Sequence, residues 1–358
     1  MNWDIVLGSA LGQGGLERVV ATVGRTLRRR GHAVRILQAQ PSEHPDWAQG
    51  LPLVHYDATA FGGMLRYEAE PDLLRWALGY MALHDSASRP DVILATHTPI
   101  FSLIARLAAG IGKDAPLILS WLHGPLAAYG EASPLLCADA HLAISRSVEA
   151  SLHSSVLAGQ PVFYIGNPVR LGVSPVRRPT RQAEFVYLGR LSPEKRLDRL
   201  LQAIARVTVP WRLTVFGDGP QAADMGSLAV SLGIADRVAW RGWQEDPWVH
   251  VESATALVLT SDYEGFGVAA AEALARGVPV VSSMSGGPEE FLRGGGGWLY
   301  PGEDIGKLAG ILQELADGTR ALPSPDLCRR AVRPYDPGLV VDRIEAAAQS
   351  ARAWSLSR

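Results

Sequence analysis

The sequence of 358 residues predicts an α/β protein with two domains, each built around a parallel sheet. Three observations support this prediction. The chain is longer than one ordinary core accommodates. Short apolar runs alternate with amphipathic stretches, which is the pattern of βαβ units on a parallel sheet. The pattern stops at the proline-rich segment 167–179 and then restarts, so this segment is expected to be a linker between two α/β halves.

The first half is expected to contain six strands with helices between them. The strands are Asp4–Leu7, Val34–Leu37, Val92–Ala95, Leu117–Trp121, His141–Ile144 and Val162–Ile165. The helices include Leu16–Arg30, which Gly31 ends, and Glu70–His84. The first eight residues contain an acidic residue and lack a basic region. They are therefore expected to form a strand and not a signal peptide.

The second half repeats this alternation. Its expected strands are Phe185–Leu188, Leu213–Phe216, Val238–Arg241, Ala256–Thr260 and Val278–Ser282. The glycine run 294–297 predicts a tight turn before Trp298–Tyr300, and a last helix is expected over Leu339–Trp354.

Composition narrows the function. A net charge of −2 provides no overall attraction to nucleic acid, and 47% hydrophobic with 20% charged residues is typical of a globular protein. Two cysteines far apart, Cys137 and Cys328, fit a reduced cytoplasmic protein. No apolar run approaches the ~20 residues that a membrane-spanning helix needs.

Glu264 and Glu272 lie eight positions apart, at the two ends of a segment that contains a Gly-Phe-Gly turn. A strand precedes this turn and an alanine-rich helix follows it, so backbone N–H groups and the positive end of the helix dipole are available to an anion. Carboxylates would repel a phosphate, so these two are expected to bind hydroxyl groups. Phosphate and hydroxyls together suggest a nucleotide sugar. The alternative is a solvated loop acid at Glu264 and a helix surface acid at Glu272.

Arg190 and Lys195 follow the first strand of the second half, after a turn at Gly189. Arginine offers a planar fork and lysine a point charge to a diphosphate. Cations at a helix N-terminus oppose the helix dipole, so a bound anion explains them better than exposure alone. The alternative is a pair of exposed basic residues.

The string Glu264-Gly-Phe-Gly-Val-Ala-Ala-Ala-Glu272, followed by Gly277-Val-Pro-Val-Val281, resembles the retaining glycosyltransferases of family 4 type. The resemblance implies the GT-B fold, in which two Rossmann-like parallel-sheet domains face each other across a cleft. Residues 1–172 would be the acceptor-side domain, 173–335 the nucleotide-sugar-binding domain and 336–358 a helix that returns to the first domain. Three phrases, at 138–145, 240–248 and 282–288, resemble bacterial lipopolysaccharide-core 1,6-galactosyltransferases more closely.

The resemblance also implies roles for individual residues. The donor's diphosphate would be held by Arg190, Lys195 and the backbone of Phe266, Gly267 and Val268, with the loop at Gly14 and Gly15 facing the phosphates. The nucleobase would lie near Trp243, the ribose on Glu272, and the transferred sugar between Glu264 and His123.

Two features of the first domain leave alternatives. The segment Gly12–Glu17 fails the dinucleotide pattern because Glu17 replaces its third glycine. The second expected strand ends in Leu37-Gln38 and not in the Asp or Glu that would bind a ribose, so NAD is not expected. Glu17 is instead expected to be a helix-start acid. His123 stands after a strand, before Gly-Pro, and His97 is its rival at the end of another strand.

The resemblance implies a retaining hexosyltransferase that uses UDP-galactose or UDP-glucose and a glycan or glycolipid acceptor such as lipopolysaccharide core. No metal is expected, because the sequence contains neither Asp-x-Asp nor a His/Cys cluster with ligand spacing. No other cofactor and no nucleic-acid partner are expected either, the latter because of the net charge of −2. A GT-B nucleotide-sugar 2-epimerase and a non-catalytic nucleotide-sugar-binding protein remain alternatives. The enzyme is expected in the cytoplasm, and Arg25 with Arg28, Arg29 and Arg30 leaves open a peripheral contact with the inner membrane beside a purely helix-dipole role.

Overall fold

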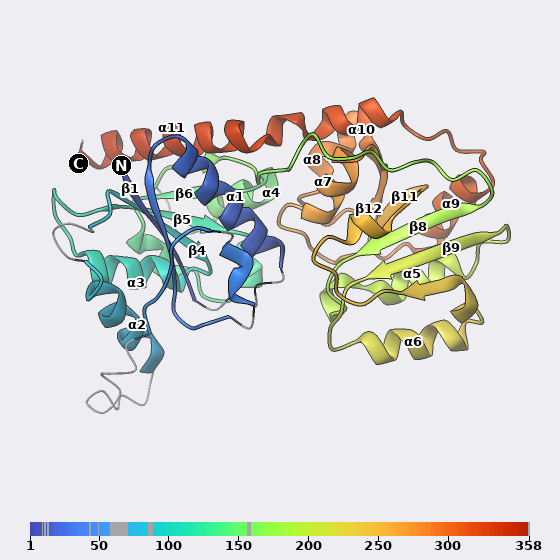
Figure 1. The fold of residues 1–358 in the computed structure, drawn as a ribbon, viewed down its shortest axis with the longest axis horizontal. Coiled ribbons are helices and arrows are strands. Elements are labelled where there is room, and N and C mark those ends of the chain that lie inside the picture. The colour runs from blue at the N-terminus through green and yellow to red at the C-terminus, as the bar shows by residue number, and fades with distance from the viewer. Residues whose placement is uncertain are drawn as a thin grey trace. The chain divides into compact units, whose positions relative to one another are not determined.

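The structure is a computed structural model that describes residues 1–8, 10, 12, 14–42, 44–48, 50–57, 71–84, 89–155 and 159–356 (Figure 1). The chain divides into two compact units. Unit 1 comprises Met1–Pro168 and Pro337–Arg358, and unit 2 comprises Val169–Asp336. The second unit therefore begins at residue 169, whereas residue 173 was expected from the sequence.

Unit 1 contains a parallel sheet in the order β3-β2-β1-β4-β5-β6-β7. The strands are β1 (Asn2–Leu7), β2 (Ala33–Gln38), β3 (Leu53–His55), β4 (Val92–His97), β5 (Leu117–Leu122), β6 (Ala140–Ala143) and β7 (Val162–Tyr164). The six expected strands are confirmed, with ends that differ by up to two residues. The edge strand β3 was not expected, because three residues are too few to show an alternating pattern.

The helices of unit 1 are α1 (Gly15–Arg29), α2 (Pro71–Met81), α3 (Ile100–Ala109), α4 (Arg146–His153) and α11 (Pro337–Leu356). Short 3-10 turns form at Pro45–Ala48, Leu126–Ala128 and Ser133–Cys137. The second helix ends at Met81 and not at the expected His84. Its expected first residue, Glu70, lies outside the described residues.

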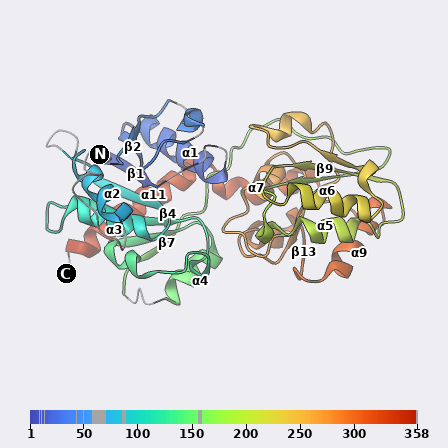
Figure 2. The same cartoon turned by 90° about the horizontal axis from the view of Figure 1, so that it is seen from below.

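The last helix, α11, packs beside α1 (Figures 1 and 2). Arg30, directly after α1, places Nη1 2.7 Å from Asp342 Oδ1 and also pairs with Glu345. His32 Nε2 lies 2.7 Å from Glu345 Oε1. These charged contacts fix the C-terminal helix on the same unit as the N-terminal strand.

Unit 2 contains a second parallel sheet, in the order β10-β9-β8-β11-β12-β13. The strands are β8 (Ala183–Leu188), β9 (Trp211–Phe216), β10 (Val238–Trp240), β11 (Ala256–Leu259), β12 (Val280–Ser283) and β13 (Gly297–Tyr300). The expected strands are confirmed, but β12 begins two residues after the expected Val278. Pro279 precedes it and has no N–H for a ladder bond, although its carbonyl accepts from Leu257.

The helices of unit 2 are α5 (Leu197–Ile204), α6 (Ala222–Ser231), α7 (Val268–Ala275), α8 (Glu289–Phe291), α9 (Ile305–Ala316) and α10 (Pro325–Val332). The strand order reverses between β8 and β11. Ligands of open α/β sheets bind at such a switch point, outside the carboxyl ends of the strands.

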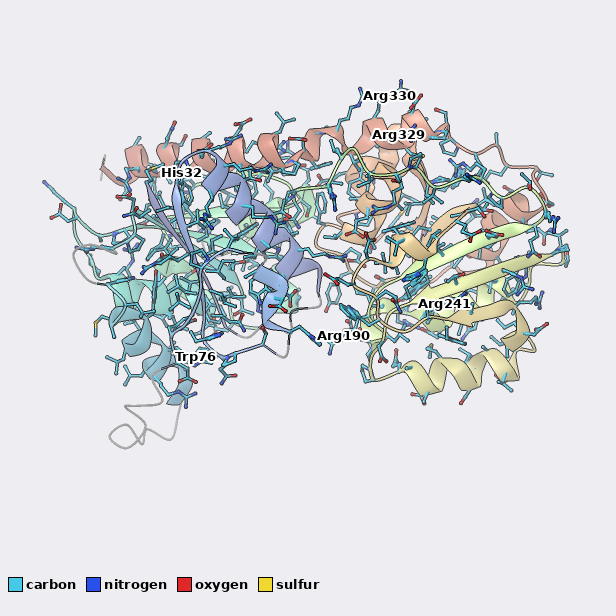
Figure 3. All side chains as sticks on the ribbon, viewed as in Figure 1. His32, Trp76, Arg190, Arg241, Arg329 and Arg330 are labelled. Carbon is cyan, nitrogen blue, oxygen red and sulfur yellow. The ribbon has the colours of Figure 1, made fainter. Side chains whose placement is uncertain are left out.

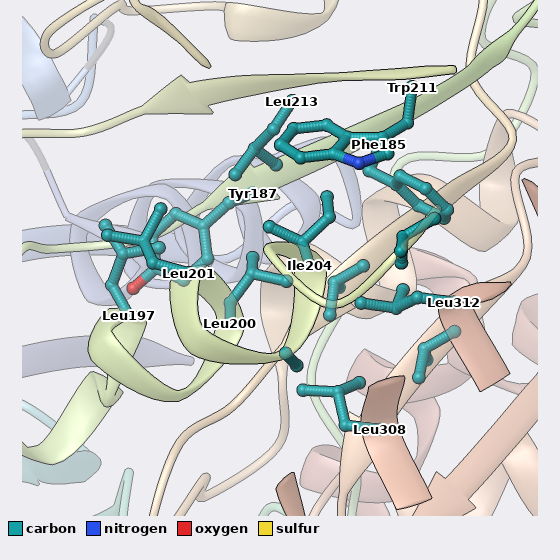
Figure 4. Packing of buried hydrophobic residues seen from close by; sticks show 14 of the residues in the cluster. Phe185, Tyr187, Leu197, Leu200, Leu201, Ile204, Trp211, Leu213, Leu308 and Leu312 are labelled. Atoms are coloured by element: carbon teal, nitrogen blue, oxygen red, sulfur yellow. The ribbon is translucent and has the colours of Figure 1, made fainter. Parts of the chain in front are cut away.

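A buried apolar core holds α5 against this sheet. Leu197, Leu200, Leu201 and Ile204 follow helical spacing and are almost completely buried. They pack with Phe185 and Leu213 of the sheet and with Leu308 and Leu312 of α9 (Figure 4). Helices α5, α6 and α9 lie together on this face in Figure 2. The core thus fixes the beginning of α5 at the switch point.

Candidate active site

The loops after β8 and β11 are hydrogen-bonded to each other at the switch point of unit 2. Lys195 ends the 3-10 turn Pro193–Lys195, and its carbonyl accepts a hydrogen bond from Thr260 Oγ1 at 2.9 Å. The N–H of Asp262 donates to the carbonyl of Glu194 at 2.8 Å. These two bonds hold the lysine loop beside the segment that leads to Glu264.

The side chains of Lys195 and Glu264 meet directly. Lys195 Nζ lies 2.8 Å from Glu264 Oε1, and the two side chains are 24% and 14% exposed. The buried Ser261 donates its hydroxyl to the same carboxylate oxygen at 2.7 Å. The backbone of Glu264 is also fixed, because its N–H donates to Ser285 and its carbonyl accepts from Gly287. Main chain and side chain thus both hold the carboxylate in place.

The turn before α7 brings backbone groups into tight contact. Gly267 has φ +82°, and a Cβ there would lie 2.6 Å from Pro288 Cγ. A Cβ on Gly287 would lie 2.4 Å from Phe266 Cα. The first N–H groups of a helix have no partner within the helix, so this turn presents donors to an anion.

The ring of Phe266 belongs to the core. It is buried, with ring centroids 5.5 Å from Phe291 and 5.0 Å from Tyr335. Only the main chain of Phe266 is therefore suited to a ligand, as the resemblance implies for this position.

Glu272 lies on α7, one turn after Val268. Its Oε2 accepts a hydrogen bond from Trp248 Nε1 at 3.2 Å, and its carbonyl accepts from Arg276 Nη1 at 3.2 Å. Its carboxylate is therefore held by a residue outside the Glu264–Glu272 segment.

Arg190 and Trp243 project from loops that stack on one another. The N–H of Gly189 donates to Phe216, and the N–H of Gly217 donates to the carbonyl of Gly242. A Cβ on Gly217 would lie 1.9 Å from the Gly189 carbonyl oxygen, so the close approach requires glycine. Arg190 is exposed and Trp243 is 39% exposed on these loops. The side chains of Arg190 and Arg241 are labelled in Figure 3.

In unit 1, His123 directly follows β5. Its Nε2 lies 3.0 Å from Thr96 Oγ1, and its ring centroid lies 4.7 Å from that of Trp121. Burial, and secondarily the neighbouring His97, lower the pKa of His123 to about 3. The imidazole is therefore neutral at pH 7, so any ligand that reaches it would meet a hydrogen-bonding group and not a charge.

His97, the rival candidate, ends β4 at the same edge of the sheet. Its backbone is left-handed, with φ +83°, which is uncommon for a residue other than glycine. Its Cα pairs with that of Leu122, next to His123. Burial lowers the pKa of His97 although Glu17 opposes this shift. The structure thus brings both histidines to one edge.

The glycine loop of unit 1 is closed by Glu17. Gly14 is the residue before α1 and Gly15 is its first residue. Glu17 lies in the first turn and accepts the N–H of Gly12 at 3.0 Å through Oε1. A Cβ on Gly14 would lie 2.6 Å from Glu17 Oε2. Glu17 is confirmed as a helix-start acid, and it shapes the loop by hydrogen bonding.

The arginines at the end of α1 form hydrogen bonds and ion pairs with other residues of unit 1. Arg30 pairs with α11, Arg28 Nη1 donates to Gly50 at 3.0 Å, and Arg29 Nη2 donates to Thr26 at 3.0 Å. Arg25 Nη2 lies 3.4 Å from Thr22 Oγ1.

None of the helices within the described ranges combines the length and apolar character needed to cross a membrane. Across the same part of the chain, no group of three or more His, Cys, Asp or Glu side chains is arranged to hold a metal ion.

Sequence reasoning missed Ser261 and Trp248 as partners of the two glutamates. A serine at a strand end has no distinctive pattern, and Ser261 is identified only by its contact with Glu264. Trp248 lies in the phrase 240–248, which we interpreted only as a sign of relationship.

Fold and site together define a two-unit parallel α/β protein whose second unit presents a lysine, two fixed carboxylates and a helix N-terminus at its switch point. Comparisons with known proteins agree. The model of the family "Glycosyl transferases group 1" matches residues 174–333, and that of "Glycosyltransferase Family 4" matches residues 13–172. The chain belongs to this family of glycosyltransferases and has the GT-B fold.

Individual relatives make the match more specific. The lipopolysaccharide 1,6-galactosyltransferase of Escherichia coli (strain K12) is 30% identical over 328 residues, which cover 87% of this chain and 88% of that protein. The enzyme of the same description from Salmonella typhimurium is 34% identical over 239 residues, or 64% and 66% of the two chains. The solved apo form of the lipopolysaccharide outer core galactosyltransferase WaaB has a TM-score of 0.81 and 27% identity, and covers 98% of this chain and 99% of its own.

Proposed function

We propose that the protein transfers a hexose from UDP-galactose or UDP-glucose to a glycan or glycolipid acceptor such as lipopolysaccharide core, with retention of configuration and without a metal ion. The similarity to 1,6-galactosyltransferases over most of the chain supports this donor and acceptor class. The observation that carries the proposal is the contact of Lys195 with Glu264 at the switch point of unit 2, beside the N-terminus of α7.

The diphosphate is proposed to bind Arg190, Lys195 and the N–H groups of Phe266, Gly267 and Val268. Each cation contributes a charge-assisted hydrogen bond, and the helix N-terminus adds favourable partial charge. This basic set neutralises the leaving group, which is the task of a divalent ion in other phosphate chemistry. In unit 1, Gly14 and Gly15 are proposed to face the phosphates with their backbone.

The remaining site residues are proposed to bind the uncharged parts of the donor. Glu272 binds the ribose hydroxyls, and Trp243 lies against the nucleobase. Glu264 binds hydroxyls of the transferred sugar, and the neutral imidazole of His123 donates or accepts a hydrogen bond there.

Retention follows when the acceptor attacks the anomeric carbon on the face from which UDP leaves. The bond from that carbon to the β-phosphate oxygen breaks and a bond to the acceptor oxygen forms. The acceptor's proton passes to the departing phosphate oxygen, so no carboxylate pair is needed as acid and base. Stabilisation of the leaving diphosphate by fixed cations and N–H groups is then the main catalytic contribution.

We further propose a cytoplasmic location with peripheral contact at the inner membrane. Both cysteines, Cys137 and Cys328, are unpaired, which suits a reducing compartment. A lipid contact would use Arg25, Arg28 and Arg29, because Arg30 is paired with α11.

A panel of UDP, GDP and ADP sugars tests the proposal, with and without a lipopolysaccharide-core acceptor. We expect acceptor-dependent release of UDP and a product whose anomeric configuration, measured by NMR, matches the donor. Release of nucleotide at the same rate with and without acceptor, or formation of an epimerised sugar, would contradict the proposed transferase activity. The match to glycosyltransferases favours it over the 2-epimerase and over the non-catalytic binding protein.

A further inference from the structure

Trp248 lies outside the Glu264–Glu272 segment but donates a hydrogen bond to Glu272. It lies in the 3-10 turn Pro247–His250 after β10, 24 residues before Glu272. Its side chain is 6% exposed, and its Nε1–H donates to Glu272 Oε2 at 3.2 Å. A neutral indole thus contacts the carboxylate assigned to the ribose.

The surrounding contacts hold the indole in place. The N–H of Trp248 donates to Asp246 Oδ1 at 3.2 Å, which fixes the start of the turn. The guanidinium of Arg276 lies 5.1 Å from the centroid of the Trp248 ring, within the range of a cation–π contact. Arg276 also donates to the carbonyl of Glu272, one helical turn earlier. Trp248, Glu272 and Arg276 therefore each contact the other two.

Burial alone does not account for the bond. Five other tryptophans of this chain have a buried Nε1 without a hydrogen-bond partner among the described residues: Trp3, Trp47, Trp76, Trp121 and Trp211. Among the described residues, a buried indole N–H is therefore not always paired with a protein acceptor. The N–H of Trp248, by contrast, points at a carboxylate of the proposed site.

We propose that Trp248 is a positioning residue that holds the Glu272 carboxylate in the rotamer that binds the donor ribose. This inference rests on the proposed function of Glu272. A glutamate on a helix surface has several accessible rotamers, and binding a ribose diol requires one of them. A charge-assisted N–H bond to Oε2 selects that rotamer before the donor arrives, so less freedom is lost on binding.

The variant Trp248→Phe tests this by keeping an aromatic ring beside Arg276 while removing the N–H. We expect the donor KM and the UDP dissociation constant to rise about 3- to 10-fold, with kcat changed by less than about twofold, as for loss of one hydrogen bond used in binding. Trp211→Phe is the matched control, since Trp211 is 1% exposed and its Nε1 has no partner among the described residues. It should leave UDP affinity unchanged.

A donor analogue separates positioning from general damage. The loss in Trp248→Phe should disappear with 2′,3′-dideoxy-UDP, which lacks the hydroxyls that Glu272 binds. An equal loss with both ligands would overturn the inference. Glu272→Gln separates it from the proposed function: if Glu272→Gln weakens UDP binding and folded Trp248→Phe does not, only the role of Trp248 is wrong. If Glu272→Gln also binds UDP like wild type, the ribose role itself fails.

A measurement on the unaltered tryptophan covers the case in which Trp248→Phe does not fold. With 15N-labelled tryptophan, one indole N–H resonance should shift in Glu272→Gln and the same resonance should shift when UDP is added to wild type. If no indole resonance responds to both changes, the inference is overturned.

Discussion

Lys195 Nζ lies 2.8 Å from Glu264 Oε1, and this contact joins the loop after β8 to the loop after β11. The two side chains are proposed to bind different parts of the donor, the diphosphate and the sugar. A diphosphate that reaches Lys195 must therefore share the ammonium group with Glu264. The hydrogen bond from Ser261 keeps the carboxylate in place when the lysine is drawn toward phosphate.

Replacing Lys195 by alanine should weaken UDP binding by ~1.5–3 kcal/mol, the size of a charge-assisted contact. Isothermal calorimetry with UDP measures this loss. Lys307→Ala provides the control, because Lys307 lies on α9 and is exposed. If Lys195→Ala binds UDP as tightly as Lys307→Ala does, Lys195 does not hold the diphosphate.

The sequence predicted most of the fold because its strands are continuous apolar runs bounded by glycine and proline. The run Leu117–Leu122 is completely buried in β5 and could not be mistaken for a loop. Strand β3 escaped because a partly exposed three-residue edge strand has no such run. Its existence depends on pairing with β2, which local sequence does not encode.

The site was predictable at the level of positions but less so at the level of contacts. Glycine spacing located the turn at Gly267, since its positive φ and its contact with Pro288 require glycine. The contact of Lys195 with Glu264 spans 69 residues, and the contact of Trp248 with Glu272 spans 24. Such contacts depend on how strands are ordered in the sheet, so a motif alone does not reveal them.

Activity should survive EDTA, because the proposed diphosphate site is built from cations and N–H groups. UDP release is measured before and after dialysis against the chelator, and then with Mn²⁺ or Mg²⁺ restored. Rates should agree within about twofold, a difference of less than ~0.5 kcal/mol in activation free energy. Complete loss that a divalent ion reverses would show that a metal, and not Arg190 with Lys195, neutralises the diphosphate.

The arginines on α1 should mediate any binding to anionic lipid. Each basic residue near such a surface contributes ~1 kcal/mol, so changing Arg25, Arg28 and Arg29 together to alanine should abolish flotation with anionic vesicles. Neutral vesicles provide the baseline. If wild type and the triple variant float equally well with anionic vesicles, these arginines do not bind lipid. Their roles are then limited to complementing the helix dipole and forming intramolecular hydrogen bonds.

A control for that experiment removes the same charge elsewhere. Arg181, Arg206 and Arg212 are exposed on unit 2, and their triple alanine variant should float like wild type. Equal losses in both triple variants would mean that only net charge matters.

His123 should not titrate between pH 5 and 8, since burial and His97 lower its pKa to about 3 from a usual 6.5. The unfolded chain then binds this proton first, so the stability that neutral His123 contributes is present above pH 6.5 and is lost as the pH falls toward 3. Histidine side-chain NMR, assigned with His123→Gln, follows the ring directly. A titration midpoint of His123 near pH 6.5 would show that burial does not keep its imidazole neutral.

The two glutamates should fail in different ways. Glu272 is proposed to bind ribose, whose charge does not change during the reaction, so Glu272→Gln should raise the donor KM more than it lowers kcat. Glu264 is proposed to face the sugar as positive charge develops on the ring, so Glu264→Gln, which keeps the shape and removes the charge, should lower kcat by ~10²-fold or more. Because Lys195 and Ser261 both bond to Oε1, the amide also loses an ion pair there, and UDP affinity must be measured in parallel. A fall in kcat at unchanged UDP affinity locates the effect in the transition state. If Glu264→Gln keeps the wild-type kcat and Glu272→Gln loses it, the roles assigned to the two glutamates are reversed.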